Sequence, residues 1–385
     1  MHRSLSPSAD VVVIGAGIIG CAAAAIMADR GARVILVEGV SVGAGASGRN
    51  LGAIQHPFDP VLAGLYVESL TRYRALAELP RSPFGIGTEP AGLLLLHADP
   101  DASAAQARRM ADAYPELRPT YLDPDEVHRV EPALAPGPAG VHLATGYPIP
   151  PASATEAWAR LAERRGAELL AGQAGRPVIQ DGRVVAVSLA GGEQLSTNAV
   201  LVAAGPWSPA IVDPGGTWRP IRPTYGVTVQ VRLGAGAPRL VVEEDDVDAI
   251  NRADAATERA ASADAPEPPS VFSAASAGGL TTIGSTFLPV EPDPAQVEQL
   301  LLRRAATYLP GVMESEVVGR RMCARPQSLD GRPLIGPLRH ASGLYICAGH
   351  GPWGISTGPA SGAIAARAIL DGTPPPPELA ATRAL

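Results

Sequence analysis

The chain has 385 residues, of which 46% are hydrophobic and 18% charged, and this apolar content excludes general disorder. The length suits two domains, or one domain with a large insertion. Apart from histidine, the basic residues are 31 arginines and no lysine. Against 38 acidic residues they leave a net charge of −7, which argues against nucleic acid binding. Three cysteines without a C-x-x-C pair predict a cytoplasmic protein with neither a disulfide framework nor a metal site.

The N-terminal segment follows the order of a dinucleotide-binding unit. Its parts are a β-branched strand (residues 11–14), glycines in the spacing G-x-G-x-x-G (Gly15, Gly17 and Gly20), an alanine-rich helix (21–30), a second strand (33–37) and a closing acid (Glu38). Gly15 allows a tight turn, Gly17 lets the backbone approach a pyrophosphate, and Gly20 lets the helix pack on the strand. Glu38 can accept bonds from ribose hydroxyls and repels a 2′-phosphate, so we predict a dinucleotide other than NADP.

An alternative interpretation exists for the same segment. Residues 11–28 carry no charge and could be taken for a signal peptide or a membrane span. The glycine spacing accounts for the stretch better, so the sequence gives no strong membrane signal.

Three later segments repeat the pattern of small residues after apolar runs. In residues 42–52, Ser47 is predicted to cap a short helix that faces the pyrophosphate. Residues 199–208 predict a buried strand ending in a glycine turn, and residues 344–354 predict another, followed by a helix that runs to Ile369. Because these turns are spread over the whole chain, they favour one long cofactor lying across one sheet over a contiguous NAD domain.

These segments resemble the D-amino-acid oxidase superfamily of FAD-dependent oxidoreductases, in the branch of glycine oxidase and sarcosine oxidase. The resemblance lies in residues 10–38, 45–52, 200–208 and 325–372. The last segment contains Arg325-Pro326 and then Asp330-Gly331-x-Pro333-Leu334-Ile335-Gly336, similar to a stretch shared by the family. The resemblance implies an α/β fold, with a Rossmann-like FAD-binding domain of the glutathione reductase type. A substrate domain of antiparallel sheet and helices is inserted into it.

The expected domains are discontinuous. They comprise residues 9–82, 148–215 and 320–372 for FAD, residues 83–147 and 216–319 for substrate, and flexible termini at 1–8 and 373–385. Hydrophobic patterns predict helices over residues 61–79, 153–165 and 295–309, and strands over 166–208, 221–233 and 279–286. Residues 84–146 predict short strands between proline-rich turns, and residues 243–269 predict an exposed acidic excursion.

The resemblance also implies which residues bind FAD. They are Gly15, Gly17, Ile18, Ile19, Gly20, Glu38, Ser47, Arg49, Asn50, Gly52, Ala204, Gly205, Trp207, Gly349, His350, Gly351, Trp353 and Gly354. The helix that starts near Gly354 is expected to aim its N-terminus at flavin N1 and O2, where negative charge develops on reduction. His350 either contacts the flavin or holds the turn.

Three residues are candidates for the substrate site. Arg325 matches the arginine that holds the substrate carboxylate in glycine oxidase-like enzymes, and a guanidinium fork suits a carboxylate. Its alternative is a structural arginine paired with an acid. Tyr225 either lines the substrate cavity or packs in the core, and His56 either reaches the cavity or is simply packed or solvated.

Cys323 falls where sarcosine oxidase-like members attach FAD covalently. The residues between Cys323 and Asp330 look more like the glycine oxidase-like branch, so we expect non-covalent FAD, with a link at Cys323 as the alternative.

The expected activity is oxidation of the C–N bond of an amino acid or secondary amine, by hydride transfer to flavin N5, giving an imine that hydrolyses. Two alternatives stay open. One is a flavin-dependent 2-hydroxy-acid dehydrogenase, and the other is the catalytic subunit of a hetero-oligomeric amine dehydrogenase that passes electrons to a partner. The expected partners are a small-molecule substrate and either a second copy of the chain or an electron-accepting subunit.

Overall fold

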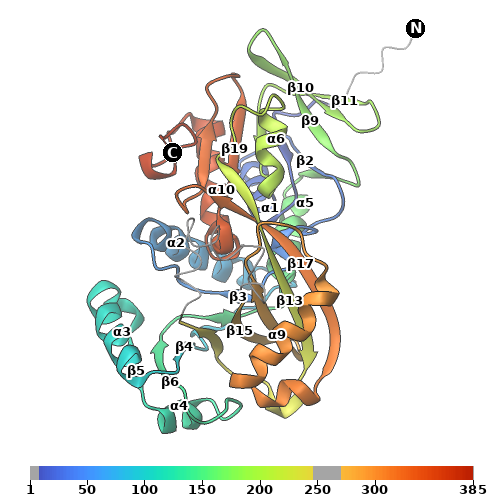
Figure 1. Cartoon of the computed structure of the whole chain (residues 1–385). Coiled ribbons are helices and arrows are strands. Elements are labelled where there is room, and N and C mark those ends of the chain that lie inside the picture. The colour runs from blue at the N-terminus through green and yellow to red at the C-terminus, as the bar shows by residue number, and fades with distance from the viewer. Residues whose placement is uncertain (1–7, 246–269, 385) are drawn as a thin grey trace.

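A computed structural model describes residues 8–245 and 270–384 of the chain. Two sheets organise these residues, and Figure 1 shows them in the upper and lower halves of the molecule. The long strands β13 (Ile221–Arg232) and β17 (Glu316–Ser328) belong to the lower sheet and run toward the upper half.

The upper sheet has six strands in the order β18-β19-β12-β1-β2-β8, all parallel except β18. Its strands are β1 (Val11–Ile14), β2 (Val34–Glu38), β8 (Glu168–Ala171), β12 (Val200–Val202), β18 (Leu334–Pro337) and β19 (Leu344–Ala348). Alternate residues of β1 belong to different hydrophobic clusters, Val11 and Val13 to one and Val12 and Ile14 to the other. Both faces of the sheet are therefore covered, as β-branched parallel strands require.

Helices cover one face of this sheet, and a smaller sheet lies against the other. The helices are α1 (Ile18–Asp29), α2 (Pro60–Glu78), α5 (Ser153–Arg164) and α10 (Gly354–Asp371). The opposite face holds α6 (Ser208–Val212) and the antiparallel strands β9 (Gly175–Gln180), β10 (Arg183–Leu189) and β11 (Gln194–Ser196). The helices α1 and α10 pack closely at Gly362, which has no side chain. A Cβ at this position would lie only 3.0 Å from the backbone nitrogen of Ala23.

The lower sheet has eight strands in the order β17-β13-β16-β15-β14-β4-β6-β5, antiparallel apart from the pair β14–β4. Its other strands are β4 (Leu93–His97), β5 (Thr120–Leu122), β6 (Ala139–Leu143), β14 (Val241–Glu244), β15 (Ser270–Ala277) and β16 (Leu280–Thr286). The helix α9 (Pro294–Tyr308) packs on β13 to β17, and α3 (Pro100–Ala113) and α4 (Pro124–Val130) lie beside β5 and β6. Two short strands, β3 (Ala53–Ile54) and β7 (Tyr147–Pro148), pair with each other.

The fold class expected from the sequence is confirmed, and the five helices predicted over residues 21–30, 61–79, 153–165, 295–309 and from Gly354 to Ile369 correspond to α1, α2, α5, α9 and α10. The strands predicted over residues 221–233 and 279–286 correspond to β13 and β16. The helices α3 and α4 were not predicted. Each begins with an Asp-Pro pair, Asp99-Pro100 and Asp123-Pro124, in which the aspartate caps the helix and the proline takes its first position.

Two further expectations need correction. Glu243 and Glu244, assigned to an exposed excursion, are buried residues of β14, and residues 246–269 lie outside the described residues. The C-terminal segment is packed instead of loose. Leu379 is 1% exposed, and Arg383 makes a bidentate contact with Asp330, with N–O distances of 2.7 and 2.8 Å. Residues 1–7 and 385 are not described.

Candidate active site

A cavity of about 600 Å³ lies between the two sheets, where the carboxyl ends of β1, β2 and β12 face the lower sheet. Most residues predicted to bind FAD line it, namely Gly15, Gly17, Ile18, Ile19, Glu38, Ser47, Arg49, Asn50, Ala204, Gly205, Trp207, His350, Gly351, Trp353 and Gly354. Arg325 and Cys323 line the opposite wall. The carboxyl edge of a parallel sheet is where doubly wound folds bind their ligands.

The first glycine turn is closely packed, as its predicted spacing requires. Gly15 has a φ of 108°, and a Cβ there would lie 2.6 Å from the carbonyl oxygen of Ala203. A Cβ on Gly20 would lie 1.9 Å from the carbonyl oxygen of Gly15, so this residue sits behind the turn and does not line the cavity. The turn thus brings the start of α1, the positive end of the helix dipole, to the cavity.

Polar side chains fix the neighbouring loops. The Glu38 carboxylate accepts hydrogen bonds from the backbone N–H groups of Ala16 at 2.8 Å and Val40 at 2.9 Å. Ser47 lies inside a 3₁₀ turn (Ala46–Gly48), and its Oγ accepts from the N–H of Ile18 at 3.0 Å, so it caps α1 and not a helix of its own. The expectation of a separate helix capped by Ser47 was therefore wrong.

Asn50 ties this loop to the rest of the molecule. Its Nδ2 donates to the carbonyls of Ser47 at 2.7 Å and Pro151 at 2.9 Å, and its Oδ1 accepts from the N–H of Gly52. Gly52, with a φ of 91°, lies behind the loop and outside the cavity lining.

Another glycine turn lines the cavity between β19 and α10. Gly349 and Gly351 both have positive φ, of 92° and 53°, and a 3₁₀ turn then leads into Gly354, the first residue of α10. Gly349 is not among the lining residues, but the first turn of α10 is, and no described side chain caps its N–H groups. The helix therefore presents the positive end of its dipole to the cavity.

The side chain of His350 indicates whether a dinucleotide fits the cavity. Its side chain is buried and lines the cavity, and neither ring nitrogen has a hydrogen-bond partner in the described part of the chain. Burial lowers the pKa of His350 to about 3, so the ring is neutral at physiological pH. Buried polar atoms are seldom left unpaired, so these nitrogens, together with the glycine cradle, fit a bound dinucleotide.

Arg325 lies on the lower-sheet wall of the cavity in a fixed orientation. Its Nη1 donates to the carbonyl of Thr286 at 2.9 Å and its Nη2 to Ser285 Oγ at 2.5 Å, and the guanidinium stacks 4.5 Å from the ring centroid of Phe287. A Cβ on Gly226 would lie within 2.4 Å of the guanidinium, so the glycine makes room for it. Burial lowers the pKa of Arg325, which shows how poorly its charge is solvated.

Other cations and a thiol lie on β17 or beside it. Arg321 donates to the carbonyl of Asn50 and to Thr282 Oγ1, both at 3.1 Å, and burial lowers its pKa to about 10. Arg49 donates to the carbonyl of Met322 at 3.0 Å. Cys323 is a free buried thiol in the cavity wall.

Tyr225 and His56 are not brought to the cavity. Tyr225 exchanges backbone hydrogen bonds with Leu288, at 2.7 and 2.9 Å, and its side chain is absent from the lining. His56 is buried among aromatic rings, 5.1 Å from Tyr66 and 5.5 Å from Tyr114 between ring centroids. Its burial lowers its pKa, so it behaves as a packed core histidine.

Several lining residues were missed. Glu243, Gln55, Ser273, Ser285 and Phe287 all line the cavity but were not predicted as site residues. Only Glu243 left a sequence signal, because it directly follows the apolar run Leu240-Val241-Val242, which is typical of a buried strand. In the described residues, no group of three acidic, histidine or cysteine side chains could hold a metal ion, and no helix is long and apolar enough to cross a membrane.

Oxidoreductases commonly combine a dinucleotide held along one sheet with a small substrate held against another. Comparison with known proteins makes the class specific. The family model described as FAD dependent oxidoreductase matches residues 10–368, and the chain belongs to this family.

Its relatives match nearly the whole length of the chain. A glycine oxidase of Pseudomonas aeruginosa is 30% identical, over 91% of this chain and 92% of that protein. The crystal structure of a glycine oxidase from Bacillus cereus has a TM-score of 0.79 and 25% identity, over 95% and 96% of the two chains. That of the Geobacillus kaustophilus glycine oxidase has a TM-score of 0.82 and 24% identity, over 99% and 100%. The chain is thus an FAD-dependent enzyme that oxidises amino acids or amines.

Proposed function

We propose that the enzyme oxidises the carbon–nitrogen bond of a substrate that carries a carboxylate, and that Arg325 holds this carboxylate. One observation carries the proposal. The half-buried Arg325 side chain lines the cavity, donates only to neutral oxygens, and has no acidic partner within residues 8–245 and 270–384. A cation that is largely removed from water and lacks a counter-ion is costly, and a bidentate carboxylate offsets that cost.

The residues of this chain also suggest how FAD is held. We place the ribose of its adenosine at Glu38, its pyrophosphate at the Gly15–Gly17 turn and the start of α1, and its ring beside His350 and the start of α10, without a bond to Cys323. The upper sheet with its helices would then form the FAD-binding domain and the lower sheet the substrate-binding domain. Because β17 crosses residue 320, this strand would belong to both.

When bound, FAD supplies a hydride acceptor. Arg325 orients the substrate by its carboxylate, and the stacked Phe287 and the bond to Ser285 keep the guanidinium from turning. The uncapped N–H groups of α10 favour negative charge where they face the cavity. The substrate loses a hydride from carbon and a proton from nitrogen, and the resulting imine takes up water to give a carbonyl compound and ammonia or an amine.

Anaerobic bleaching of the bound flavin by amino acids, N-methyl amino acids and 2-hydroxy acids tests the proposal. We expect bleaching by amines that carry a carboxylate, and a KM about 100-fold higher in Arg325→Ala with unchanged FAD content. Equal losses of FAD and of substrate affinity would contradict the role of Arg325. Bleaching by hydroxy acids alone would select the dehydrogenase alternative, and reoxidation by dyes but not by oxygen would favour a partner subunit.

A further inference from the structure

One amide in the cavity wall has an oxygen without a partner. The Gln55 side chain lines the cavity and is buried, with the residue 8% exposed. Its Nε2 donates to Glu243 Oε1 at 3.0 Å, but its Oε1 has no hydrogen-bond partner within the part of the chain that the structure describes. Buried polar atoms are seldom left unpaired, so we expect this oxygen to meet a hydrogen-bond donor on a bound ligand.

The contact with Glu243 determines which way the Gln55 amide faces. An ionised carboxylate accepts hydrogen bonds and donates none, so the NH2 group of Gln55 must face Glu243. The opposite orientation of the amide would bring two oxygens together. The free Oε1 is therefore an acceptor, and the ligand group beside it must carry a polar hydrogen, as an amine does and a methyl group does not.

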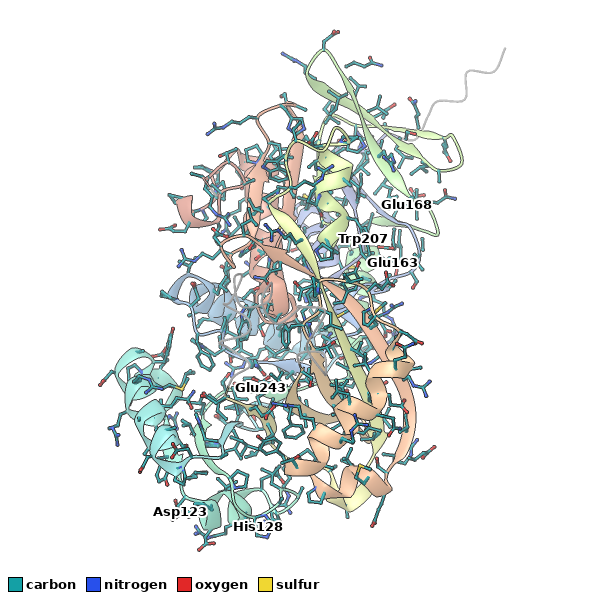
Figure 2. All side chains as sticks on the ribbon, in the orientation of Figure 1. Asp123, His128, Glu163, Glu168, Trp207 and Glu243 are labelled. Carbon is teal, nitrogen blue, oxygen red and sulfur yellow. The ribbon has the colours of Figure 1, made fainter. Side chains whose placement is uncertain are left out.

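Gln55 is held from both sides of the cavity. Its backbone N–H donates to Ser356 Oγ at 3.0 Å, in the first turn of α10, and its side chain reaches β14 through Glu243. Figure 2 shows Glu243 near the junction of the two halves of the molecule. The amide thus lies with the lower sheet, which faces the substrate in the proposed function, and not with the glycine turns of the upper sheet.

The separation of Gln55 from Arg325 suits a small amino acid. Arg325 is bonded to Ser285 and Thr286 of β16, and β15 separates this strand from β14. Two strand spacings correspond to roughly 10 Å. Two hydrogen bonds of about 2.9 Å, with the roughly 3 Å between the nitrogen and a carboxylate oxygen of an α-amino acid, span about 9 Å. A carboxylate held by Arg325 therefore brings the neighbouring amine within reach of the Gln55 amide.

We propose that Gln55 Oε1 accepts a hydrogen bond from the amine nitrogen of the substrate, and so distinguishes an amine from an apolar group of the same size. This inference rests on the proposed role of Arg325. An amide oxygen accepts a hydrogen bond but is not a base near neutral pH, so Gln55 positions the nitrogen and does not remove its proton. Two fixed groups then recognise the substrate, Arg325 its carboxylate and Gln55 its amine.

Binding to the reduced holoenzyme tests this contact without turnover, because a reduced flavin cannot accept a hydride. Glycine and propanoate differ at one position, where the first has an ammonium and the second a methyl group. Isothermal titration calorimetry of the dithionite-reduced, oxygen-free enzyme is expected to give a Kd at least tenfold lower for glycine. In Gln55→Met this preference should fall to within twofold, while the Kd of propanoate and the FAD content stay unchanged. Ser273→Ala, which removes a hydroxyl from the same cavity wall, is the matched control and should keep the preference.

The outcomes separate the two proposals. Equal Kd values for the two probes in the unaltered enzyme overturn the role of Gln55 whether or not any variant folds, and so does a preference that survives in Gln55→Met. Loss of FAD from Gln55→Met with the preference retained would show that the amide serves the flavin instead. Binding of neither probe contradicts the carboxylate site on which the inference rests.

The role of Arg325 has its own test. If Arg325→Ala binds propanoate as tightly as the unaltered enzyme, that role fails. In that case a preference lost only in Gln55→Met would still support an amine contact at Gln55.

Discussion

The two walls of the cavity are built by different means. On the side of the upper sheet, which we name the cofactor wall after the proposed function, glycine turns after parallel strands bring backbone N–H groups to the cavity, and each turn is encoded by a few consecutive residues. On the side of the lower sheet, named the substrate wall for the same reason, the functional groups are side chains of β13, β14, β15, β16 and β17, which lie far apart in the sequence. The cofactor wall therefore depends on the absence of side-chain atoms, and the substrate wall on which residues the strand register places together.

The largest effect is expected from adding one carbon atom to the cofactor wall. Gly20→Ala places a Cβ 1.9 Å from the Gly15 carbonyl oxygen, which is backbone and cannot turn away. The helix α1 must then move off the strand, and we expect the free energy of unfolding to fall by about 3 kcal/mol with loss of bound FAD. Urea denaturation and flavin absorbance after purification measure the two effects.

Gly64→Ala is the matched control. Gly64 lies in α2, and a Cβ there meets nothing within 4 Å, so the variant should gain up to about 1 kcal/mol from helix propensity and keep its FAD. If Gly20→Ala retains FAD and full stability, the cofactor wall does not depend on close backbone packing, and the contrast between the walls fails.

A smaller effect is expected from the same substitution on the substrate wall. In Gly226→Ala the new Cβ would occupy the place of the Arg325 guanidinium, which must tilt away from Ser285 and Thr286. We expect KM for a carboxylate substrate to rise about 10- to 100-fold, the equivalent of roughly 1.4 to 2.7 kcal/mol, with FAD content unchanged. Steady-state kinetics and flavin absorbance distinguish this from a general loss of structure.

Gly319→Ala serves as the control on the neighbouring strand β17. A Cβ on Gly319 meets nothing within 4 Å, so KM should not change. Loss of FAD in Gly226→Ala would show that the two walls are coupled and not independent.

The same contrast explains what the sequence could predict. The strand, glycine turn and acid of residues 11–38 are contiguous, so local spacing was enough to predict the cradle that the structure shows. Arg325 was found through a family motif and lies in the cavity, but Gly226 was not, because its role depends on a register between strands almost 100 residues apart. Tyr225 occupies the position next to Gly226, and successive residues of a strand point to opposite faces.

Contacts between segments that are distant in the sequence could not be predicted from local sequence patterns either. The C-terminal segment has four consecutive prolines from Pro374 to Pro377, which favoured a loose end, yet Ala380 pairs with Ile335 and Arg383 with Asp330. Both partners lie on a distant part of the chain, so no local pattern could have identified them. Glu243 was misread for a similar reason, since its strand is defined by pairing with β4 and β15.

The smallest effect is expected from His350. At this position the cofactor wall presents a side chain to the cavity and not a glycine turn. The unfolded chain protonates His350 near pH 6.5, but in the folded protein burial lowers its pKa to about 3. The stability that depends on the neutral ring is therefore present above pH 6.5 and is lost as the pH falls from 6.5 toward 3. Between pH 8 and pH 5.5 this amounts to about 1.4 kcal/mol.

Urea denaturation of FAD-free protein at the two pH values measures this loss. His350→Gln should lose about 1.4 kcal/mol less than the unaltered chain over the same pH range. The difference between variants is the readout because burial also lowers the pKa values of His56 and His142, and both contribute to the total. An identical pH dependence in His350→Gln would mean that water reaches the ring in solution, and that this wall is held by its glycine turns alone.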